Sequence, residues 1–445
     1  MKKVSPVILM VMLAAALLAA CSGGDNGNNG SSPSASPSPS ASESASASPS
    51  ASSEPSASAL TGKIKVLSHR TDLVNDGTMD KYAAKFKEKY PGAEIEFEAL
   101  TNYATDIKVR ITTGEAGDVN MLDGGMATSE LPNYYEPLPD SMFEDVYFPD
   151  IRSHEGKRYG ITTGVNTQGI VYNKTAFAKA GVDKVPTTLD ELYDAAAKLK
   201  EAGIIPLYMN FGAQWPMTNW GENSYAYVAG DAKWTDTLIA QEAPFTVDGP
   251  WGKLIQIART FVENEWVEKD LSTNNWEMSK GEIASGKAAM YFLGNWVIPQ
   301  VIGAGAKSED IGFFPLPYDN GGTYNVPLGG DYFIGVSEDS KNKELAIAWV
   351  EFFVKESGYV EDSGFMPIVK SQEPKVPQMA EFASFNPNYI ESEFTDPRYN
   401  EIANKAEIAL GTGSVDQELV MAKDLQKAFD DLNQKWAKAK KELGY

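Results

Sequence analysis

Strand-like and helix-like segments alternate along the chain from residue 63 onward. The stretches KIKVLSH (63–69), AEIEFEAL (93–100) and DVNMLD (118–123) have the β-branched or alternating pattern of strands. The segments between them, GTMDKYAAKFKEKYPG and NYATDIKVRITTGE, have the composition and periodicity of helices. Strands that alternate with helices predict an α/β fold with a parallel sheet.

Local signals mark the ends of several of these helices. The first helix is expected to end at Tyr90-Pro91-Gly92, since proline and glycine stop helices. A later helix is expected to begin at Leu189, after a Thr cap, and to end at Gly203, with a strand over 204–210. The apolar face expected for the first helix consists of Met79, Tyr82, Ala83 and Phe86.

Polar residues follow two of the predicted strands. His69, Arg70 and Asp72 come directly after the first strand, and Asp123 ends the third. Ligands of open α/β sheets bind beyond the carboxyl ends of the strands, so these residues are candidates for ligand contacts on one rim. The alternatives are a solvated polar loop for the first three and, for Asp123, a cap on the turn before Gly124.

Charge and cysteine content exclude several classes of function. The 445 residues include 61 acidic and 39 basic side chains, and the formal net charge of −22 repels nucleic-acid phosphates. We therefore expect no nucleic-acid partner. A single cysteine excludes an intrachain disulfide and a cysteine-based zinc site, and the two histidines, His69 and His154, lie far apart in the sequence. We expect no metal site and no cofactor.

Residues 1–20 have the pattern of a secretory signal peptide. Lys2 and Lys3 precede an apolar run over 7–20 that is too short to span a bilayer, which takes about 20 residues. The run ends in LAAC, which resembles the bacterial lipobox and implies cleavage before Cys21 and acylation of its sulfur. The alternative is an ordinary signal peptide with an incidental cysteine. We expect a chain that is lipid-anchored on the outer face of the cell membrane.

Residues 21–60 are predicted to form a tether behind Cys21. Ser, Ala, Pro, Gly and Asn dominate this stretch, and such a composition buries too little apolar surface to offset the entropy of ordering. We predict a disordered linker that holds a folded body away from the bilayer.

Longer motifs in the folded body resemble one known family. They include KFKEKYPGAEIEFEAL, ITTGEAGDVNML, GKRYGI, GIVYNKTAFAKAGV, GEIASGKAAMYFLGNW, IGFFPLPYDNGGTYNVPLGGDYFIGVS and SGFMPIVKS. In this order they resemble the extracellular solute-binding proteins of family 1, the receptors of sugar-importing ABC transporters, with maltose-binding protein as the best-known relative. The resemblance covers nearly all of residues 63–370.

The resemblance implies a periplasmic-binding-protein-like fold of type II. Two α/β lobes are joined by crossing segments, the ligand lies in the cleft between them, and closure is a hinge motion. We expect the N-lobe over 61–167 plus 317–352 and the C-lobe over 168–316 plus 353–445. The crossings are expected near 166–169, 315–318 and 351–355.

The resemblance also implies ligand contacts at particular residues. Asn166 stands six residues before Tyr172, where maltose-binding protein keeps a sugar-binding glutamate, and Gln168 is nearby. Trp215 and Trp296 occupy positions where the family carries sugar-stacking aromatics. The full set of expected ligand-binding residues is His69, Arg70, Asp72, Asp123, Asn166, Gln168, Trp215, Trp220, Trp296 and Asp331. The tryptophans expected in the core instead are Trp251, Trp266, Trp276 and Trp349.

The sequence thus predicts a monomeric receptor that captures a mono- or oligosaccharide and delivers it to two transmembrane permease subunits without bond chemistry. One alternative is a cell-surface glycoside hydrolase, which needs two carboxylates about 5–10 Å apart. A second alternative is a solute receptor for a peptide, a polyamine or a metal complex.

Overall fold

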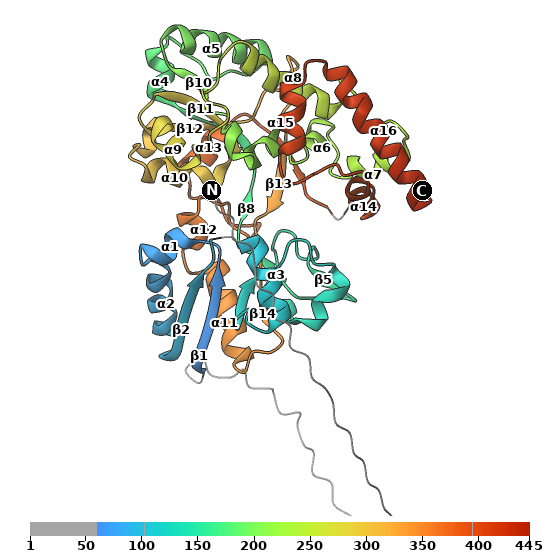
Figure 1. The fold of residues 1–445 in the computed structure, drawn as a ribbon. Coiled ribbons are helices and arrows are strands. Elements are labelled where there is room, and N and C mark those ends of the chain that lie inside the picture. The colour runs from blue at the N-terminus through green and yellow to red at the C-terminus, as the bar shows by residue number, and fades with distance from the viewer. Residues whose placement is uncertain (1–59, 102, 394) are drawn as a thin grey trace, which may run out of the picture. The chain divides into compact units, whose positions relative to one another are not determined.

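The computed structural model describes residues 60–101, 103–393 and 395–445, and it confirms the α/β class with two lobes (Figure 1). The predicted signal peptide, Cys21 and residues 22–59 of the predicted linker lie outside the described residues. Within the described part of the chain, no helix is both long and apolar enough to cross a bilayer.

The N-lobe is built on one mixed sheet. Its strands are β1 (Thr61–Ser68), β2 (Gly92–Ala99), β3 (Val119–Met121), β4 (Tyr135–Glu136), β7 (Ile161–Thr162) and β14 (Phe333–Ser337). They are ordered β2–β1–β3–β14–β4, and β7 also pairs with β14. β1 runs parallel to β2 and to β3, whereas β14 is antiparallel to β3. The three strands predicted from the first 123 residues are confirmed as β1, β2 and β3, and β14 returns from much later in the sequence.

Helices cover this sheet with apolar faces that the sequence indicated. They are α1 (Thr71–Asn75), α2 (Thr78–Lys89), α3 (Tyr103–Thr113), α11 (Lys343–Lys355) and α12 (Tyr359–Asp362). The expected face of α2 is confirmed, because all four of its predicted apolar residues are buried. Trp349 of α11 is fully buried against Phe86 of α2, with ring centroids 5.2 Å apart. The short elements of this lobe are η2 (Thr128–Asn133), η3 (Asp140–Phe143), β5 (Ser153–His154) and β6 (Lys157–Arg158).

The C-lobe has a second sheet and a separate core. Its strands are β9 (Gln168–Asn173), β10 (Ile205–Leu207), β11 (Ala288–Gly294) and β12 (Ile311–Phe314), in the order β10–β11–β9–β12. β10 and β11 are parallel, and β9 is antiparallel to both of its neighbours. Every residue of β11 is buried, so this strand lies at the centre of the lobe.

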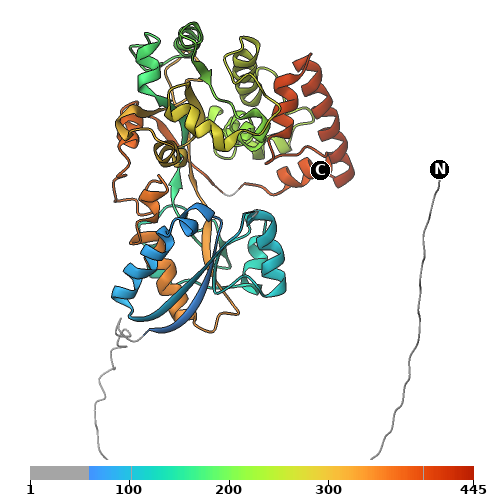
Figure 2. The same cartoon turned by 60° about the vertical axis from the view of Figure 1, so that its left-hand side comes forward.

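The helices of the C-lobe surround this sheet and extend beyond it. They are α4 (Lys174–Lys179), α5 (Leu189–Glu201), α6 (Tyr225–Val228), α7 (Trp234–Ile239), α8 (Pro250–Glu263), α9 (Trp276–Ala284), α10 (Ile298–Gly303), α13 (Pro377–Ala383), α14 (Arg398–Lys405), α15 (Ser414–Met421) and α16 (Leu425–Leu443), with 3-10 turns η4 (Phe211–Ala213), η5 (Trp215–Trp220), η6 (Asn295–Val297) and η7 (Ser308–Asp310). The predicted cap of α5 is confirmed, because Thr188 Oγ1 accepts a hydrogen bond from the Glu191 amide at 3.3 Å. α15 and α16 pack side by side (Figure 2).

A small third sheet lies where the chain passes between the lobes. It contains β8 (Val165–Asn166), β13 (Asn325–Gly330) and β15 (Asn388–Glu391), in the order β15–β13–β8. The first crossing agrees with the expectation, because the chain leaves the N-lobe sheet at β7, passes through β8 and enters the C-lobe sheet at β9.

The other two expected crossings are wrong, and the lobe boundaries move with them. Leu316 and Tyr318 pack in the C-lobe core, so the return to the N-lobe is made by β13 instead. Phe353 and Ile368 pack in the N-lobe core, so the last crossing follows residue 368. For the last crossing, the physical reason is that α11 runs unbroken through residue 355 and buries one continuous apolar face.

Candidate functional site

Three tryptophans meet on the C-lobe in a tryptophan cluster of Trp215, Trp276 and Trp296. Trp215 opens η5, Trp276 opens α9, and Trp296 lies in η6 directly after β11. Their ring centroids are 5.0, 5.7 and 5.9 Å apart. Trp215 leaves 38% of its surface exposed, and among the described residues no other tryptophan is this exposed. The cluster therefore presents an indole that is braced by two others.

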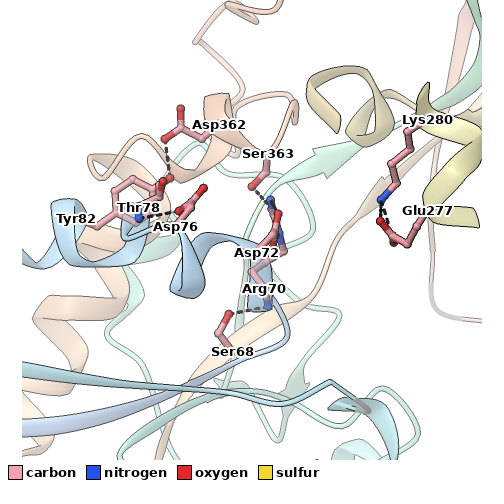
Figure 3. Close-up of polar contacts among 10 residues, drawn as sticks. All are labelled: Ser68, Arg70, Asp72, Asp76, Thr78, Tyr82, Glu277, Lys280, Asp362 and Ser363. Atoms are coloured by element: carbon pink, nitrogen blue, oxygen red, sulfur yellow. Dashed lines mark hydrogen bonds and ion pairs between the residues drawn. The ribbon is translucent and has the colours of Figure 1, made fainter. Parts of the chain in front are cut away.

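A lysine covers one member of the tryptophan cluster. Lys280 Nζ lies 4.8 Å from the ring centroid of Trp276. It also lies 2.9 Å from a carboxylate oxygen of Glu277 (Figure 3). The cation is thus shared between an aromatic face and an acidic neighbour one turn away. Lys280 adds a hydrogen-bond donor beside the indoles, and its charge is already paired.

On the N-lobe, the first predicted site residue packs in a second aromatic group. The His69 ring stacks on Tyr332 with centroids 4.3 Å apart, and Tyr103 meets both rings edge-on at 6.0 and 5.9 Å. His69 Nδ1 is buried and has no hydrogen-bond partner within the described part of the chain. This end of β1 therefore combines aromatic faces with an unused polar atom.

The Arg70 guanidinium is held on three sides. Its Nε and Nη2 donate to the two carboxylate oxygens of Asp72 at 2.8 and 2.7 Å, and its Nη1 donates to Ser363 Oγ at 2.5 Å (Figure 3). Burial opposes the charged form, but the hydrogen bonds that Arg70 donates to Asp72 outweigh it and raise the pKa of Arg70. The pair joins α1 to the segment after α12 and presents no unpaired charge.

His69 makes the stability of the N-lobe sensitive to acid. Burial, followed by the nearby Arg70 charge, lowers the pKa of His69 to about 3. The neutral ring is thus favoured in the folded state. Its contribution to the free energy of unfolding is complete above about pH 6.5, the pKa of the unfolded chain, and is lost as the pH falls towards about 3. We expect His69→Gln to lose less unfolding free energy than wild type between about pH 7 and pH 4.

Urea unfolding at a series of pH values measures this difference. His154→Gln is the matched control, because it replaces the other histidine, which lies half-buried in the short β5. If the unfolding free energy of His69→Gln and that of wild type fell equally between pH 7 and pH 4, His69 would not be the source of the acid sensitivity.

Three other predicted residues lie on or next to the crossing strands. Asn166 is half-buried in β8, opposite Gly329 of β13. Gln168 opens β9, and its Oε1 accepts a hydrogen bond from Ser224 Oγ at 2.6 Å. Asp331 follows β13 and accepts from Thr163 Oγ1 at 3.2 Å, and burial raises the pKa of its carboxyl. These side chains occupy the junction between the lobes.

Asp123 has a local structural role. Its Oδ1 accepts a hydrogen bond from the Gly125 amide at 3.0 Å and lies 3.8 Å from Lys108 Nζ. This is the turn cap that the sequence offered as the alternative to ligand binding. The second carboxylate oxygen makes no hydrogen bond within the described residues, so a ligand role for Asp123 stays a prediction.

Two tryptophans differ from their predicted roles. Trp220 was expected to contact ligand, but only 2% of it is exposed and it packs on Phe292 at 4.8 Å in the C-lobe core, so that prediction is wrong. Trp276 was expected in the core, but it is half-buried and completes the tryptophan cluster. Its position at the first residue of a helix, after Asn274 and Asn275, was the available signal, because such a residue has no preceding turn to pack against.

The segment that carries Trp296 is fastened to the first crossing segment and to the N-lobe. The fully buried Asn295 accepts a hydrogen bond from the Thr167 amide at 2.8 Å and donates one to the Gly364 carbonyl at 2.7 Å. Trp296 itself packs against the N-lobe core and against a C-lobe core. One indole of the tryptophan cluster is therefore in contact with both lobes.

Comparison with known proteins gives the same fold and a common family. The chain is 26% identical to an uncharacterized ABC transporter extracellular-binding protein of Pyrococcus horikoshii over 313 residues, 66% of this chain and 68% of the relative. It is 22% identical to the multiple sugar-binding protein of Streptococcus mutans over 298 residues, 62% of this chain and 68% of the relative.

A solved structure is similar over most of both chains. It is a manno-oligosaccharide specific solute-binding protein of Bifidobacterium animalis subsp. lactis in complex with mannotriose, with 26% identity, a TM-score of 0.77, and coverage of 87% of this chain and 96% of that one. The family model for the bacterial extracellular solute-binding proteins matches residues 71–360. With two lobes, three crossing segments and this match, the chain belongs to the bacterial extracellular solute-binding proteins.

Proposed function

We propose that this protein is the oligosaccharide receptor of an ABC importer. The observation that carries the proposal is the tryptophan cluster, in which Trp215 is 38% exposed and is braced by Trp276 and Trp296. A sugar ring has a C–H face that stacks on an indole and hydroxyl edges that need polar partners. Similar proteins named for multiple sugars and for manno-oligosaccharides support this class of ligand.

The charges near the candidate residues favour an uncharged ligand. The Arg70 guanidinium is neutralised by a bidentate bond to Asp72, and Lys280 is paired with Glu277. An anionic ligand would have to compete with these carboxylates, and a polyamine would have to compete with the two cations. A neutral oligosaccharide needs only the hydrogen-bonding capacity that these groups retain.

A binding panel tests the proposal. Isothermal titration calorimetry with mannotriose, maltotriose, raffinose and diacetylchitobiose should give saturable binding of at least one sugar. The Kd should be micromolar or tighter, which corresponds to a binding free energy of about −8 kcal/mol or a more negative value. Spermidine and a tripeptide serve as matched non-sugar ligands. Binding of one of these with no response to any sugar would overturn the assignment.

The enzymatic alternative is a separate question with its own measurement. The candidate carboxylates Asp72 and Asp123 are engaged by Arg70 and by the Gly125 amide, which leaves them poorly placed to act as an acid–base pair. We therefore propose that the bound sugar is released intact. Chromatography of the sugar after long incubation with the protein should recover it unchanged, and appearance of shorter sugars would make the protein a glycoside hydrolase.

We also propose that the chain is a monomer held to the membrane by lipid on Cys21 and that it delivers its sugar to two transmembrane permease subunits. Two acyl chains on one cysteine suffice for stable anchoring at about 0.8 kcal/mol per buried methylene. Wild-type protein should stay with the membrane fraction after a high-salt wash, whereas the Cys21→Ala variant should be released into the soluble fraction. The folded body should keep its melting temperature, and membrane retention of the variant would contradict the anchor.

A further inference from the structure

The backbone that presents Trp215 is strained at the residue before it. We call residues 210–221 the tryptophan loop. Gln214 has φ 68° and ψ −62°, the angles of a γ-turn that residues with a side chain rarely adopt. Asn210 also has a positive φ of 55°, but asparagine tolerates this left-handed conformation well. The strain is therefore concentrated at Gln214, whose conformation needs support from neighbouring elements.

The base of the tryptophan loop is held by the buried Glu268. The two carboxylate oxygens of Glu268 accept hydrogen bonds from the Met209 and Phe211 amides at 2.7 and 3.0 Å, and the residue is only 6% exposed. The loop also packs on the backbone that precedes α9, because a Cβ on Gly212 would lie 2.3 Å from the Thr273 carbonyl oxygen. These contacts hold residues 209–212 and leave the strained turn to another support.

The start of α15 supports the strained turn from the other side. Gln417 Nε2 donates a hydrogen bond to the Phe211 carbonyl, and Gln417 Oε1 accepts one from Gln214 Nε2 at 3.2 Å. The backbones are also in close contact, because a Cβ on Gly413 would lie 2.2 Å from the Gln214 carbonyl oxygen. Within the described part of the chain, no other side chain outside the loop hydrogen-bonds residues 212–215.

The role of Gln417 depends on the chemistry of its primary amide. The amide donates to a backbone carbonyl and accepts from a side chain at the same time. A carboxylate in its place could only accept and would face the Phe211 carbonyl oxygen, and a methionine of similar length offers no donor. Packing alone does not call for an amide here, because Gln417 is only half-buried.

We propose that Gln417 is a positioning residue, which holds the strained turn at Gln214 and thereby sets the orientation of Trp215 for the sugar. This inference rests on the proposed function. The Trp215 indole meets Trp276 and Trp296 with ring centroids 5.0 and 5.7 Å away, and the residue follows the strained turn directly. Without the two hydrogen bonds of Gln417 the turn can relax, and the indole then loses its fixed place in the tryptophan cluster.

The orientation of Trp215 in the ligand-free protein is the primary test, because it does not depend on the proposed function. Fluorine NMR of protein labelled with fluorotryptophan reports on each of the nine tryptophans, and Trp215→Phe identifies the resonance of Trp215. In Gln417→Met this resonance should broaden or split, since the indole samples more than one orientation. The resonance of Trp220, which is buried at the end of the same loop, should stay unchanged.

Sugar affinity is the second readout, and it uses the oligosaccharide found by the binding panel. The Kd should rise about 3- to 10-fold in Gln417→Met, the effect expected for the loss of one hydrogen bond. In a Trp215→Ala background the same substitution should change the Kd by less than about twofold, because Gln417 acts through Trp215. Glu418→Gln changes the exposed neighbour of Gln417 on α15 and is the matched control, with the wild-type Kd and the wild-type resonances.

The two readouts separate this role from a merely structural one. An unchanged Trp215 resonance in folded Gln417→Met would overturn the positioning role, and so would an equal loss of affinity in the wild-type and Trp215→Ala backgrounds. If Gln417→Met does not fold, Gln417→Asn makes the same test, because it keeps the amide but withdraws it from the loop by one methylene. Absence of any sugar binding by wild type would overturn the proposed function alone, and the ligand-free resonance would still decide whether Gln417 positions Trp215.

Discussion

Trp215→Ala should bind the oligosaccharide about 10- to 100-fold more weakly than wild type, with a smaller loss of ligand-free melting temperature than truncation of a core tryptophan causes. The indole is 38% exposed, so its removal from the free protein costs less buried apolar area than removal of a fully buried tryptophan. Against a sugar face the same indole becomes desolvated, and its loss then removes a contact worth a few kcal/mol at about 25 cal/mol per Å². Calorimetry and thermal unfolding separate the two effects.

Trp220→Ala is the matched control, since this tryptophan lies only five positions away in η5. It is 2% exposed and packs on Phe292, so its truncation should cost about 3–5 kcal/mol of unfolding free energy. A large drop in the ligand-free melting temperature of Trp215→Ala, similar to that of Trp220→Ala, would assign Trp215 to the core and remove it from the site.

Asn295→Ala should destabilise the protein by about 2–6 kcal/mol, although it deletes only one amide group. The side chain satisfies the Thr167 amide and the Gly364 carbonyl, and each group left unpaired in a buried place costs about 1–3 kcal/mol. Because Trp296 is the next residue, sugar affinity should fall as well. Urea unfolding gives the first effect and calorimetry the second.

Asn219→Ala provides the comparison for Asn295. Asn219 is also buried in the C-lobe, with 5% exposed, but its amide donates one hydrogen bond of 3.2 Å, to the Phe292 carbonyl. Its loss should cost roughly half as much or less. Equal destabilisation by the two substitutions would show that Asn295 has no special role at the crossings.

Local features of this protein could be predicted from the sequence because they depend on neighbours along the chain. The apolar face of α2 follows from the helical repeat, and the start of α5 follows from the capping of the Glu191 amide by Thr188. The strands β1, β2 and β3 were found for the same reason. The first crossing, β8 into β9, was located by resemblance and agrees with the structure.

Features that depend on distant segments were missed. Trp220 of η5 points into the core because it packs on Phe292 of β11, about seventy positions later. No local sequence pattern indicates a contact between residues so far apart. Trp276 was assigned to a helix face, yet it is the first residue of its helix. Asn295 has its partners 128 and 69 positions away, so no local pattern indicates its role.

The late arrival of β14 in the N-lobe sheet has a consequence for the order in which the protein can fold. During synthesis β1, β2 and β3 emerge first, but the place beside β3 is filled only by residues 333–337. All four strands of the C-lobe sheet, from 168 to 314, emerge before that point. The edge of β3 in the N-lobe therefore stays unpaired at a stage when all strands of the C-lobe sheet are already available to pair. An open edge invites pairing with other chains, so a nascent chain stalled before residue 333 is expected to be prone to aggregation.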